Sequence, residues 1–339
     1  MKIHSSHSLA PHTTFGIGGP ALVLVEALTE EGMQAALALS RESGLSLYVL
    51  GAGSNVLVSD EGVHGVVLRI LLRAISFQDA GEDELCIADA GASWEDVVDA
   101  AAARGLYGIE NLAGIPGTMG GAAVQNIGAY GAELEEVFAY ADVIDRATGT
   151  KRRVMPAEAA FAYRSSFFKS NRDMIIVRVA LRLAKRSVPN TAYADLAREE
   201  ALGVPLVTAL DVVRAVRTIR ARKFPDIAHE GTAGSFFKNP VVSSEHAAEL
   251  GARFPGLPVF PQGDGRVKLP LAWILDHALG LRGYAKGPVR LYEKQPLVLV
   301  ARRGAIAGDV DALADEVRER VLAATGIAIE REVETFGTR

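Results

Sequence analysis

The segment Gly114-Ile115-Pro116-Gly117-Thr118-Met119-Gly120-Gly121 indicates what kind of ligand this fold is built to hold. The glycines at 117, 120 and 121 carry no side chain, so the backbone there can approach a flat or charged ligand closely. Thr118 is a favourable N-cap for a helix that begins beside it, and the positive end of such a helix attracts phosphate. The alternative is a helix packed closely through small residues. Further polar, aromatic and glycine positions follow at Asn126, Gly128, Tyr130 and Gly131.

A second glycine-rich segment, Gly51-Ala52-Gly53-Ser54-Asn55, follows a predicted strand over 45–50. It resembles the start of a dinucleotide fingerprint, but Val56 stands where the third glycine belongs, and the residues after it favour a strand over 56–58. A Rossmann site needs a helix there, so that interpretation is excluded. A strand–turn–strand loop whose N–H groups form an anion nest is the better interpretation, with a ligand-free turn as the alternative. Together the two segments favour a cofactor that contains pyrophosphate.

Strand and helix signals alternate around these segments, which predicts an α+β protein. Thr29 is predicted to cap a helix that ends at Gly44, and Ser93 with Asp96 resembles a capping box. Apolar residues at helical spacing (Leu210, Val213, Val216 and Ile219) predict a helix over 208–222, which Pro225 ends. Helices are also expected over 244–254, 270–279 and 309–326, with strands over 21–25, 65–69, 85–88, 137–145, 151–154, 175–183, 296–301 and 327–333.

Composition narrows the function classes. The chain has 339 residues, 49% of them hydrophobic, which suits two or three packed domains. A net charge of −5 and a pI near 5.9 argue against a general nucleic-acid binder. The single cysteine, Cys86, cannot form an internal disulfide, and no targeting segment or membrane-length apolar run is visible, so we expect a cytoplasmic protein. The histidines show no metal-ligand spacing, so no metal is predicted.

Three residues could carry chemistry. Arg164 follows Tyr163 and precedes two serines, where its guanidinium could clamp a carboxylate; an ordinary surface ion pair is the alternative. Ser235 stands on the small-residue turn 231–235 without a nucleophile-elbow pattern, so it could deliver a proton or only bond the backbone of a turn. Glu330 lies in the predicted terminal strand and could be a buried acid or, more commonly, a solvated edge residue.

Five motifs in order resemble one family. Gly51–Asn55, Gly114–Gly131, Tyr163-Arg164, Gly234–Pro240 and Glu330–Val333 together are similar to the motifs of UDP-N-acetylenolpyruvoylglucosamine reductases, the MurB family of peptidoglycan synthesis. The resemblance covers nearly the whole chain. It implies an FAD-binding domain of the vanillyl-alcohol-oxidase (PCMH) type in two lobes, followed by an α+β substrate-binding domain. The implied bounds are 1–70 for lobe 1, joined by a terminal strand over 328–339, then 71–222 for lobe 2 and 223–327 for the substrate domain.

The resemblance also implies residue roles. A type I insert over 185–205, here called the tyrosine loop, carries Tyr193, which is expected to close over the substrate. No histidine lies in the two glycine-rich segments, so FAD is expected to bind non-covalently. The implied substrate contacts are Tyr163, Tyr193, Lys223, Asn239 and Gln295. The implied FAD contacts are Gly51, Ala52, Gly53, Ser54, Asn55, Gly114, Ile115, Pro116, Gly117, Thr118, Gly121, Ala122, Gln125, Asn126, Gly128 and Tyr130.

The implied activity is reduction of an enolpyruvyl ether on UDP-N-acetylglucosamine. NADPH would pass a hydride to FAD, and FAD N5 would pass it to the vinyl methylene carbon. Arg164 and Glu330 would stabilise the resulting enolate, and Ser235 would deliver the proton. A monomer without a nucleic-acid or membrane partner is expected. Two alternatives stay open at this point, a flavin oxidase that reduces oxygen and a non-catalytic protein that binds nucleotide sugars.

Overall fold

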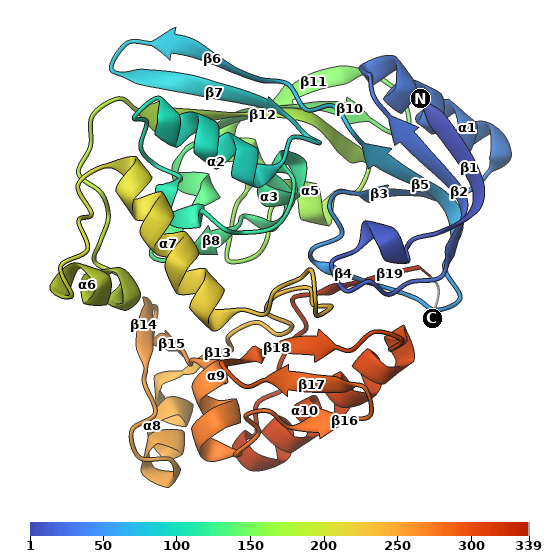
Figure 1. Ribbon diagram of the computed structural model, residues 1–339. Helices are drawn as coiled ribbons and strands as arrows, with labels where there is room; N and C mark the ends of the chain where they lie inside the picture. The colour runs from blue at the N-terminus through green and yellow to red at the C-terminus, as the bar shows by residue number, and fades with distance from the viewer. Residues whose placement is uncertain (338–339) are drawn as a thin grey trace. The chain divides into compact units, whose positions relative to one another are not determined.

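The computed structural model describes residues 1–337, and the chain divides into two units (Figure 1). The first unit consists of Met1–His7, Ala21–Ala52 and His64–Ala221. The second consists of Ser8–Pro20, Gly53–Val63 and the chain from Arg222 onward. The predicted lobe over 1–70 is therefore divided between the two units, because its segments 8–20 and 53–63 pack with the C-terminal part of the chain.

The first sheet of unit 1 has the order β1 (Lys2–Ser8), β2 (Pro20–Ala27), β5 (Val63–Ile70), β3 (Leu47–Leu50). The helix α1 (Glu30–Ser43) packs on it through Met33, Ala36 and Leu37. The predicted helix ends are confirmed. The Thr29 hydroxyl accepts the Gly32 N–H at 3.2 Å, and Gly44 takes a left-handed φ of 69° that glycine adopts without strain.

The second sheet of unit 1 is antiparallel, in the order β11 (Lys151–Val154), β10 (Phe138–Asp145), β12 (Met174–Ala184), β7 (Asp83–Asp89), β6 (Ile75–Ala80). The helices α2 (Trp94–Ala103) and α3 (Met119–Gln125) lie against it (Figure 1). The predicted capping box at Ser93 is wrong, since that side chain accepts no N–H from the helix. The buried Trp94 anchors α2, because its indole N–H donates to the Leu112 carbonyl at 2.9 Å.

Short elements connect these sheets and helices. They are η1 (Ala10–His12), η2 (Glu110–Leu112), β8 (Gly128–Ala129), β9 (Ala132–Glu133), η3 (Leu134–Glu136), α4 (Pro156–Ala159), α5 (Phe167–Ser170) and α6 (Ala194–Ala201). The predicted helix over 208–222 is confirmed as α7 (Ala209–Lys223). Its buried face includes Val212, Val213, Val216 and Ile219, whereas Leu210, expected on that face, is exposed.

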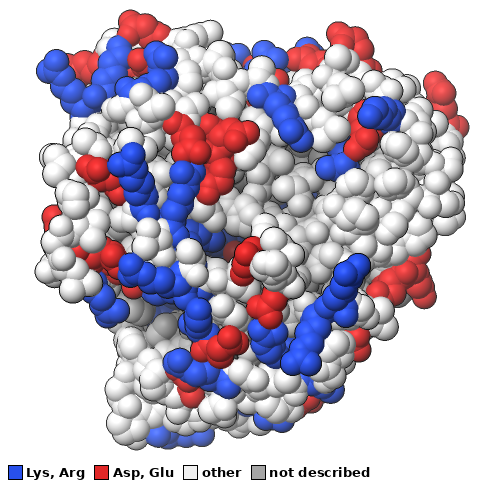
Figure 2. All heavy atoms as spheres, viewed as in Figure 1, with Lys and Arg blue, Asp and Glu red and all other residues white. Residues whose placement is uncertain are grey.

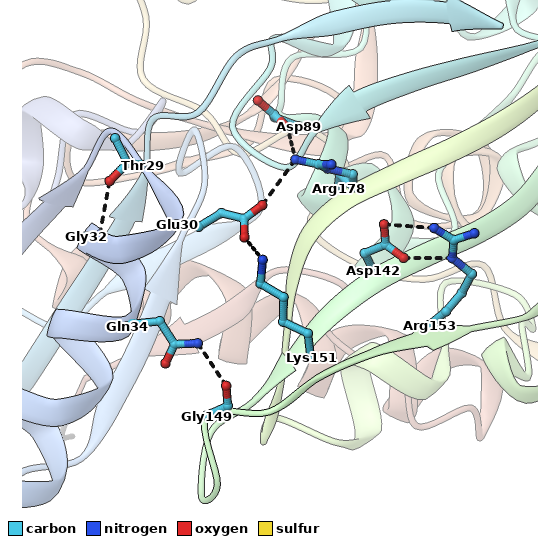
Figure 3. A network of polar contacts seen from close by, with 10 residues as sticks. All are labelled: Thr29, Glu30, Gly32, Gln34, Asp89, Asp142, Gly149, Lys151, Arg153 and Arg178. Atoms are coloured by element: carbon cyan, nitrogen blue, oxygen red, sulfur yellow. Dashed lines mark hydrogen bonds and ion pairs between the residues drawn. The ribbon is translucent and has the colours of Figure 1, made fainter.

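A polar network connects α1 with the second sheet (Figure 3). The Glu30 carboxylate pairs with Lys151 of β11 and, at 3.2 Å, with Arg178 of β12. The Gln34 amide donates to the Gly149 carbonyl at 2.8 Å. These side chains are partly exposed, so each ion pair contributes about 0–1 kcal/mol. The association of the two sheets is therefore stabilised mainly by the continuous apolar core beneath these side chains.

Unit 2 has its own core. An antiparallel sheet of β16 (Ala285–Lys286), β17 (Val289–Tyr292) and β18 (Gln295–Ala301) packs against α9 (Leu271–Trp273) and α10 (Ala307–Thr325). The predicted helix over 270–279 continues from α9 as a π-helical turn, η4 (Ile274–Ala278). A second small sheet has the order β13 (Val241–Ser243), β15 (Arg266–Lys268), β14 (Phe260–Gly263), and α8 (Ser244–Arg253) contacts it.

The prediction of a terminal strand over 327–333 is wrong, because this segment does not pair as a strand. The strand present is β19 (Glu334–Phe336), which pairs in parallel with β4 (Val56–Val58). The segment 327–333 forms one isolated bridge, from Arg331 to Phe237. Apolar residues alternate with others in this segment, and the apolar Ile327, Ile329 and Val333 are buried, whereas Arg331 and Glu332 are both half-buried. Alternation predicts which side chains face the core and does not predict a hydrogen-bonded partner.

The surface shows no uniform field of one sign on the face drawn in Figure 2, where positive and negative side chains are interspersed with uncharged ones. Over residues 1–337, no helix is both long and apolar enough to cross a membrane.

Candidate functional site

The two glycine-rich segments meet in unit 1 at Gly51 and Thr118. A Cβ added at Gly51 would lie 2.9 Å from the Thr118 hydroxyl oxygen, which is closer than real side chains allow. Thr118 caps α3 as predicted, since its hydroxyl accepts the Gly121 N–H at 3.3 Å. β3 passes through the loop into β4 without a helix, which confirms the exclusion of a Rossmann site. The two segments are therefore packed closely, and the Met119 and Gly120 N–H groups at the start of α3 donate to the Ala92 and Ala90 carbonyls, each at 2.9 Å.

The remaining residues of the first loop belong to unit 2. A Cβ at Gly53 would lie 2.2 Å from the His12 carbonyl oxygen, and its φ of 65° favours glycine. The Asn55 amide donates to the Glu332 carbonyl at 3.2 Å. The loop is thereby fixed to the terminal segment of the chain.

Asn126 closes the end of α3 with a left-handed φ of 43° and is fully buried. Its amide donates to the Ala162 carbonyl at 3.2 Å and to the Glu133 carboxylate at 3.3 Å, and its carbonyl oxygen accepts the Glu135 N–H at 3.0 Å. The side chain is thus engaged within the protein and shapes the loop. Its contact with a cofactor stays a prediction.

Arg164 is held against the same loop. Its Nη2 donates to the Gly128 carbonyl at 2.7 Å and its Nη1 to the Asn126 carbonyl at 3.4 Å. A Cβ at Gly128 would lie 3.1 Å from Nη1, so the close approach depends on glycine. The guanidinium also lies 5.1 Å from the centre of the Tyr163 ring. Arg164 has a φ of 53°, a conformation that non-glycine residues adopt mainly where the surrounding structure enforces it.

Two neighbouring contacts connect the Arg164 motif to α3. The Lys169 ammonium donates to the Gln125 side-chain oxygen at 2.6 Å and to the Arg164 carbonyl at 3.1 Å. The buried Ser166 hydroxyl donates to the Val124 carbonyl at 2.8 Å. The structure therefore brings together two motifs that are separate in the sequence, 114–131 and 163–169.

Arg220 is a residue that the sequence reasoning missed. It follows Val216 by one helical turn on α7, which places it at the edge of the buried face. Its Nε donates to the Gly114 carbonyl at 2.8 Å, and a Cβ at Gly114 would lie 2.7 Å from Arg220 Cδ. Burial lowers the pKa of Arg220 and raises the pKa of Tyr130, with which it interacts. The sequence did contain a signal for Arg220: it is an arginine one helical turn after Val216, at the edge of the apolar face of the predicted helix.

Ser235 lies in unit 2 beside β18. It forms a bridge with Val298, while the next residue, Phe236, donates its N–H to the Leu297 carbonyl at 2.8 Å. Gly234, with a φ of 75°, makes the turn before it. Gln295 begins the same strand, and its side-chain oxygen is buried without a hydrogen-bond partner. A buried acceptor without a partner fits a position that receives a donor from a ligand.

The other predicted substrate contacts are distributed between the two units. Tyr163 and Tyr193 lie in unit 1. Lys223 is the last residue of α7 and belongs to unit 2, whose C-terminal segment begins at Arg222. The Asn239 side-chain oxygen accepts the Leu271 N–H at 2.9 Å, which fixes the start of α9. Tyr193 is 45% exposed on the tyrosine loop.

The terminal segment corrects the expectation for Glu330. Its side chain is 73% exposed and pairs with Lys238 at 2.9 Å, so the buried alternative is wrong and the solvated one is confirmed. Glu332 is placed differently. It is half-buried, its N–H donates to the Phe236 carbonyl at 2.8 Å, and its carbonyl accepts from Asn55. Glu332 is therefore fixed between the residue after Ser235 and the first glycine-rich loop.

A cavity of about 330 Å³ lies between α1 and the second sheet of unit 1, and none of the predicted site residues lines it. Each of its cations is paired with a carboxylate, as Figure 3 shows for Lys151, Arg153 and Arg178, so it presents little net charge to a ligand. Among residues 1–337, no group of three or more His, Cys, Asp or Glu side chains is arranged to hold a metal ion.

Comparison with known proteins adds the identity of the fold. A family model described as "FAD binding domain" matches residues 21–154, and one described as "UDP-N-acetylenolpyruvoylglucosamine reductase, C-terminal domain" matches residues 226–336. The reductase of that name from Pseudomonas aeruginosa is 42% identical over 98% of both chains, and that from Burkholderia pseudomallei is 43% identical over 98% of this chain and 97% of its own. The crystal structure of the MurB reductase from Thermus caldophilus is 26% identical, covers 99% of this chain and 98% of its own, and superposes with a TM-score of 0.70.

Proposed function

Because this chain belongs to the UDP-N-acetylenolpyruvoylglucosamine reductase (MurB) family of FAD-dependent oxidoreductases, we propose that it uses NADPH to reduce the enolpyruvyl ether of UDP-N-acetylglucosamine to UDP-N-acetylmuramate. The α+β fold with an FAD-binding domain and a distinct C-terminal domain is confirmed. The observation that best supports the finer proposal is the Arg164 guanidinium, fixed by the loop that follows α3.

The residues of unit 1 fit FAD. The glycine-rich backbone beside the contact of Gly51 with Thr118 would receive its pyrophosphate, and Gly114 with Tyr130 would flank it. No histidine lies in the two glycine-rich segments, which supports non-covalent binding. FAD, when bound, supplies hydride transfer between NADPH and the enolpyruvyl double bond.

Gly51→Ala is expected to release FAD. The added methyl would need space now held by the Thr118 hydroxyl, and such overpacking costs about 1–3 kcal/mol. We expect a roughly 5- to 100-fold weaker FAD affinity, measured by fluorescence titration of the apoprotein. Gly251→Ala is the matched control, since a Cβ there meets nothing within 4 Å, and it should retain wild-type affinity. Equal FAD affinities in the two variants would contradict the proposal that the backbone near Gly51 and Thr118 binds FAD.

We propose that Arg164 stabilises negative charge on the substrate. Hydride addition to the vinyl methylene leaves charge on the adjoining carbon and its carboxylate. A guanidinium whose position is already fixed stabilises that charge without reorganising, an effect typically worth about 3–4 kcal/mol. The Gly128 and Asn126 carbonyls set its orientation, and the planar fork suits a carboxylate.

Ser235 is the proposed proton donor to that adjoining carbon. Ser235 is half-buried at a turn that bridges to Val298 of β18, which limits the positions its hydroxyl can take. A hydroxyl is a weak acid, so a neighbouring water or Lys223 would return the proton. One new C–H bond from hydride and one from this proton complete the lactyl ether.

The carboxyl group of the site is proposed to be Glu332, with Glu330 as the alternative. The half-buried Glu332 is tied by its backbone to Phe236 and Asn55, whereas Glu330 is solvated and paired with Lys238. In its protonated form, a carboxyl group can donate a hydrogen bond to a substrate carboxylate.

Paired variants separate the two acids. Glu332→Gln should lower kcat by about 100-fold or more, because an amide cannot share a proton. Glu330→Gln should change kcat by less than about two-fold, because its loss removes only a surface ion pair. Steady-state kinetics at saturating NADPH would measure both. The opposite ranking would return the role to Glu330.

The proposal extends to partners and location. Tyr163, Tyr193, Lys223, Asn239 and Gln295 would contact the nucleotide sugar, and the unpartnered oxygen of Gln295 supports its assignment. A cytoplasmic monomer without nucleic-acid or membrane partners is proposed, in keeping with its acidic pI and single buried cysteine.

Product analysis tests the function. The purified holoprotein, NADPH and UDP-N-acetylglucosamine enolpyruvate should give a product heavier than the substrate by two hydrogen atoms, with equimolar NADPH consumed. Oxygen consumption without NADPH would indicate a flavin oxidase. Binding of the nucleotide sugar without turnover would indicate a non-catalytic protein.

A further inference from the structure

We propose that Asn111 is a positioning residue that fixes the start of the tyrosine loop against Tyr130 and so sets the place of Tyr193. This inference rests on the proposed function, since it assigns a role to the loop that is expected to close over the substrate. It concerns contacts within unit 1 only.

Asn111 bonds two segments through one amide group. Its side chain is buried, with the residue 2% exposed, and its Nδ2 donates to the Tyr130 carbonyl at 2.8 Å and to the Asn190 carbonyl at 2.9 Å. Both partners are acceptors, so the nitrogen must face them. One amide therefore connects the loop after α3 with a segment 79 residues away from Asn111 in the chain.

The tyrosine loop makes further contacts at the same place. The Asn190 side chain donates to the Gly131 carbonyl at 3.1 Å. The Tyr193 ring meets the edge of the Tyr130 ring at a centroid distance of 5.4 Å and an interplanar angle of 79°. Three contacts thus converge on Tyr130 and Gly131, all from residues 190–193 or from Asn111.

The part of the tyrosine loop before Tyr193 has few buried apolar side chains. Val188 is 87% exposed, and the buried anchor Leu196 comes only within α6, after Tyr193. The segment before Tyr193 therefore depends on hydrogen bonds for its order. Segments with few buried apolar contacts open at low free-energy cost, so loss of one bond should be visible in this segment.

The chemistry of asparagine at position 111 supports this role. Its Oδ1 is buried without a hydrogen-bond partner, a cost that an apolar residue of similar size would avoid. The gain that offsets this cost is the pair of N–H donors. Aspartate has the same shape but would turn a carboxylate toward two carbonyl oxygens.

The test compares three variants of the flavin-loaded enzyme. Asn111→Asp should raise the KM for the enolpyruvyl substrate roughly 5- to 30-fold, as expected for loss of one or two hydrogen bonds, while kcat changes less than about two-fold. The surface variant Asn190→Ala removes the bond to Gly131 and the bond that Asn190 Oδ1 accepts from the Ala192 N–H, and it should raise KM roughly 3- to 10-fold. Thr218→Ala is the control, since its exposed hydroxyl bonds the Arg214 carbonyl on α7, outside the tyrosine loop, and its KM should stay at the wild-type value.

Two further measurements separate positioning from general destabilisation. Amide hydrogen exchange of residues 187–193 should rise in Asn111→Asp and Asn190→Ala while α2 and β12 keep wild-type protection. Adding Asn111→Asp to Tyr193→Ala should raise KM by less than about two-fold over Tyr193→Ala alone, because Asn111 acts through Tyr193.

Each outcome decides the inference. A wild-type KM and unchanged exchange in Asn190→Ala, or full additivity in the double variant, would overturn it. If Asn111→Asp fails to fold, Asn190→Ala and its exchange pattern decide alone. If the wild-type holoprotein reduces no enolpyruvyl nucleotide sugar, the proposed function fails, and the exchange data still show whether Asn111 orders the segment.

Discussion

Ser235→Ala should still allow NADPH to reduce the flavin, while reduction of the enolpyruvyl substrate falls by about 10²- to 10⁴-fold. The hydroxyl is proposed to protonate the carbon next to the one that receives hydride, and alanine has no proton to give. Removing one hydroxyl leaves the turn intact, because Gly234 and the bond from Phe236 to Leu297 set its backbone. Rapid-mixing absorbance would follow the two half-reactions separately.

Two companion variants sharpen this result. Ser235→Cys should recover part of the lost rate, since a thiol is a stronger acid than a hydroxyl. Ser244→Ala should behave as wild type, because that exposed hydroxyl bonds only the Gly265 carbonyl within unit 2. A Ser235→Ala enzyme that reduces substrate at the wild-type rate would remove Ser235 from proton delivery.

Arg164→Lys should lower kcat by about 10²- to 10³-fold with little change in FAD content. Lysine keeps the charge but loses the planar fork, so it cannot satisfy the Gly128 and Asn126 carbonyls while also facing a carboxylate in bidentate fashion. Both residues bear the same cost at a φ of 53°, so backbone strain does not differ between them. Single-turnover reduction of the substrate by the reduced enzyme would measure the effect.

Arg153→Lys is the matched control for Arg164→Lys. Arg153 also makes a forked contact, with Asp142 at 2.8 and 3.2 Å, and lies over the Tyr140 ring, but outside the proposed site. It should keep wild-type turnover. If Arg164→Lys turned over as fast as Arg153→Lys, charge alone would suffice and the bidentate role would be wrong.

Local signals in the sequence predicted local structure well. Thr29 and Gly44 marked the ends of α1, Thr118 marked the start of α3, and the alternation of 327–333 predicted its buried side chains. Ser93 shows the limit of such local signals. Ser93 and Asp96 match the capping-box pattern, but the Ser93 side chain accepts no N–H from α2. The partner of the terminal strand, β4, is more than 270 residues away, and no local pattern encodes such a pairing.

The site was predictable where backbone chemistry defines it and not where side chains from distant segments meet. Gly117, Gly120 and Gly121 pointed to close backbone approach, and the structure shows two such approaches nearby, Gly51 with Thr118 and Gly114 with Arg220. Asn111 and Arg220 carried no motif, because their partners are main-chain carbonyls of other segments. The difference between Glu330 and Glu332 depends on burial and backbone contacts that spacing alone does not provide.

One anaerobic spectroscopic experiment tests the central claim most directly. The purified protein should show flavin absorbance that NADPH bleaches and that one equivalent of UDP-N-acetylglucosamine enolpyruvate then restores, yielding UDP-N-acetylmuramate. Restoration in wild type and its absence in Ser235→Ala would support the account. A protein that binds no flavin, or a bleached flavin that only oxygen restores, would contradict it.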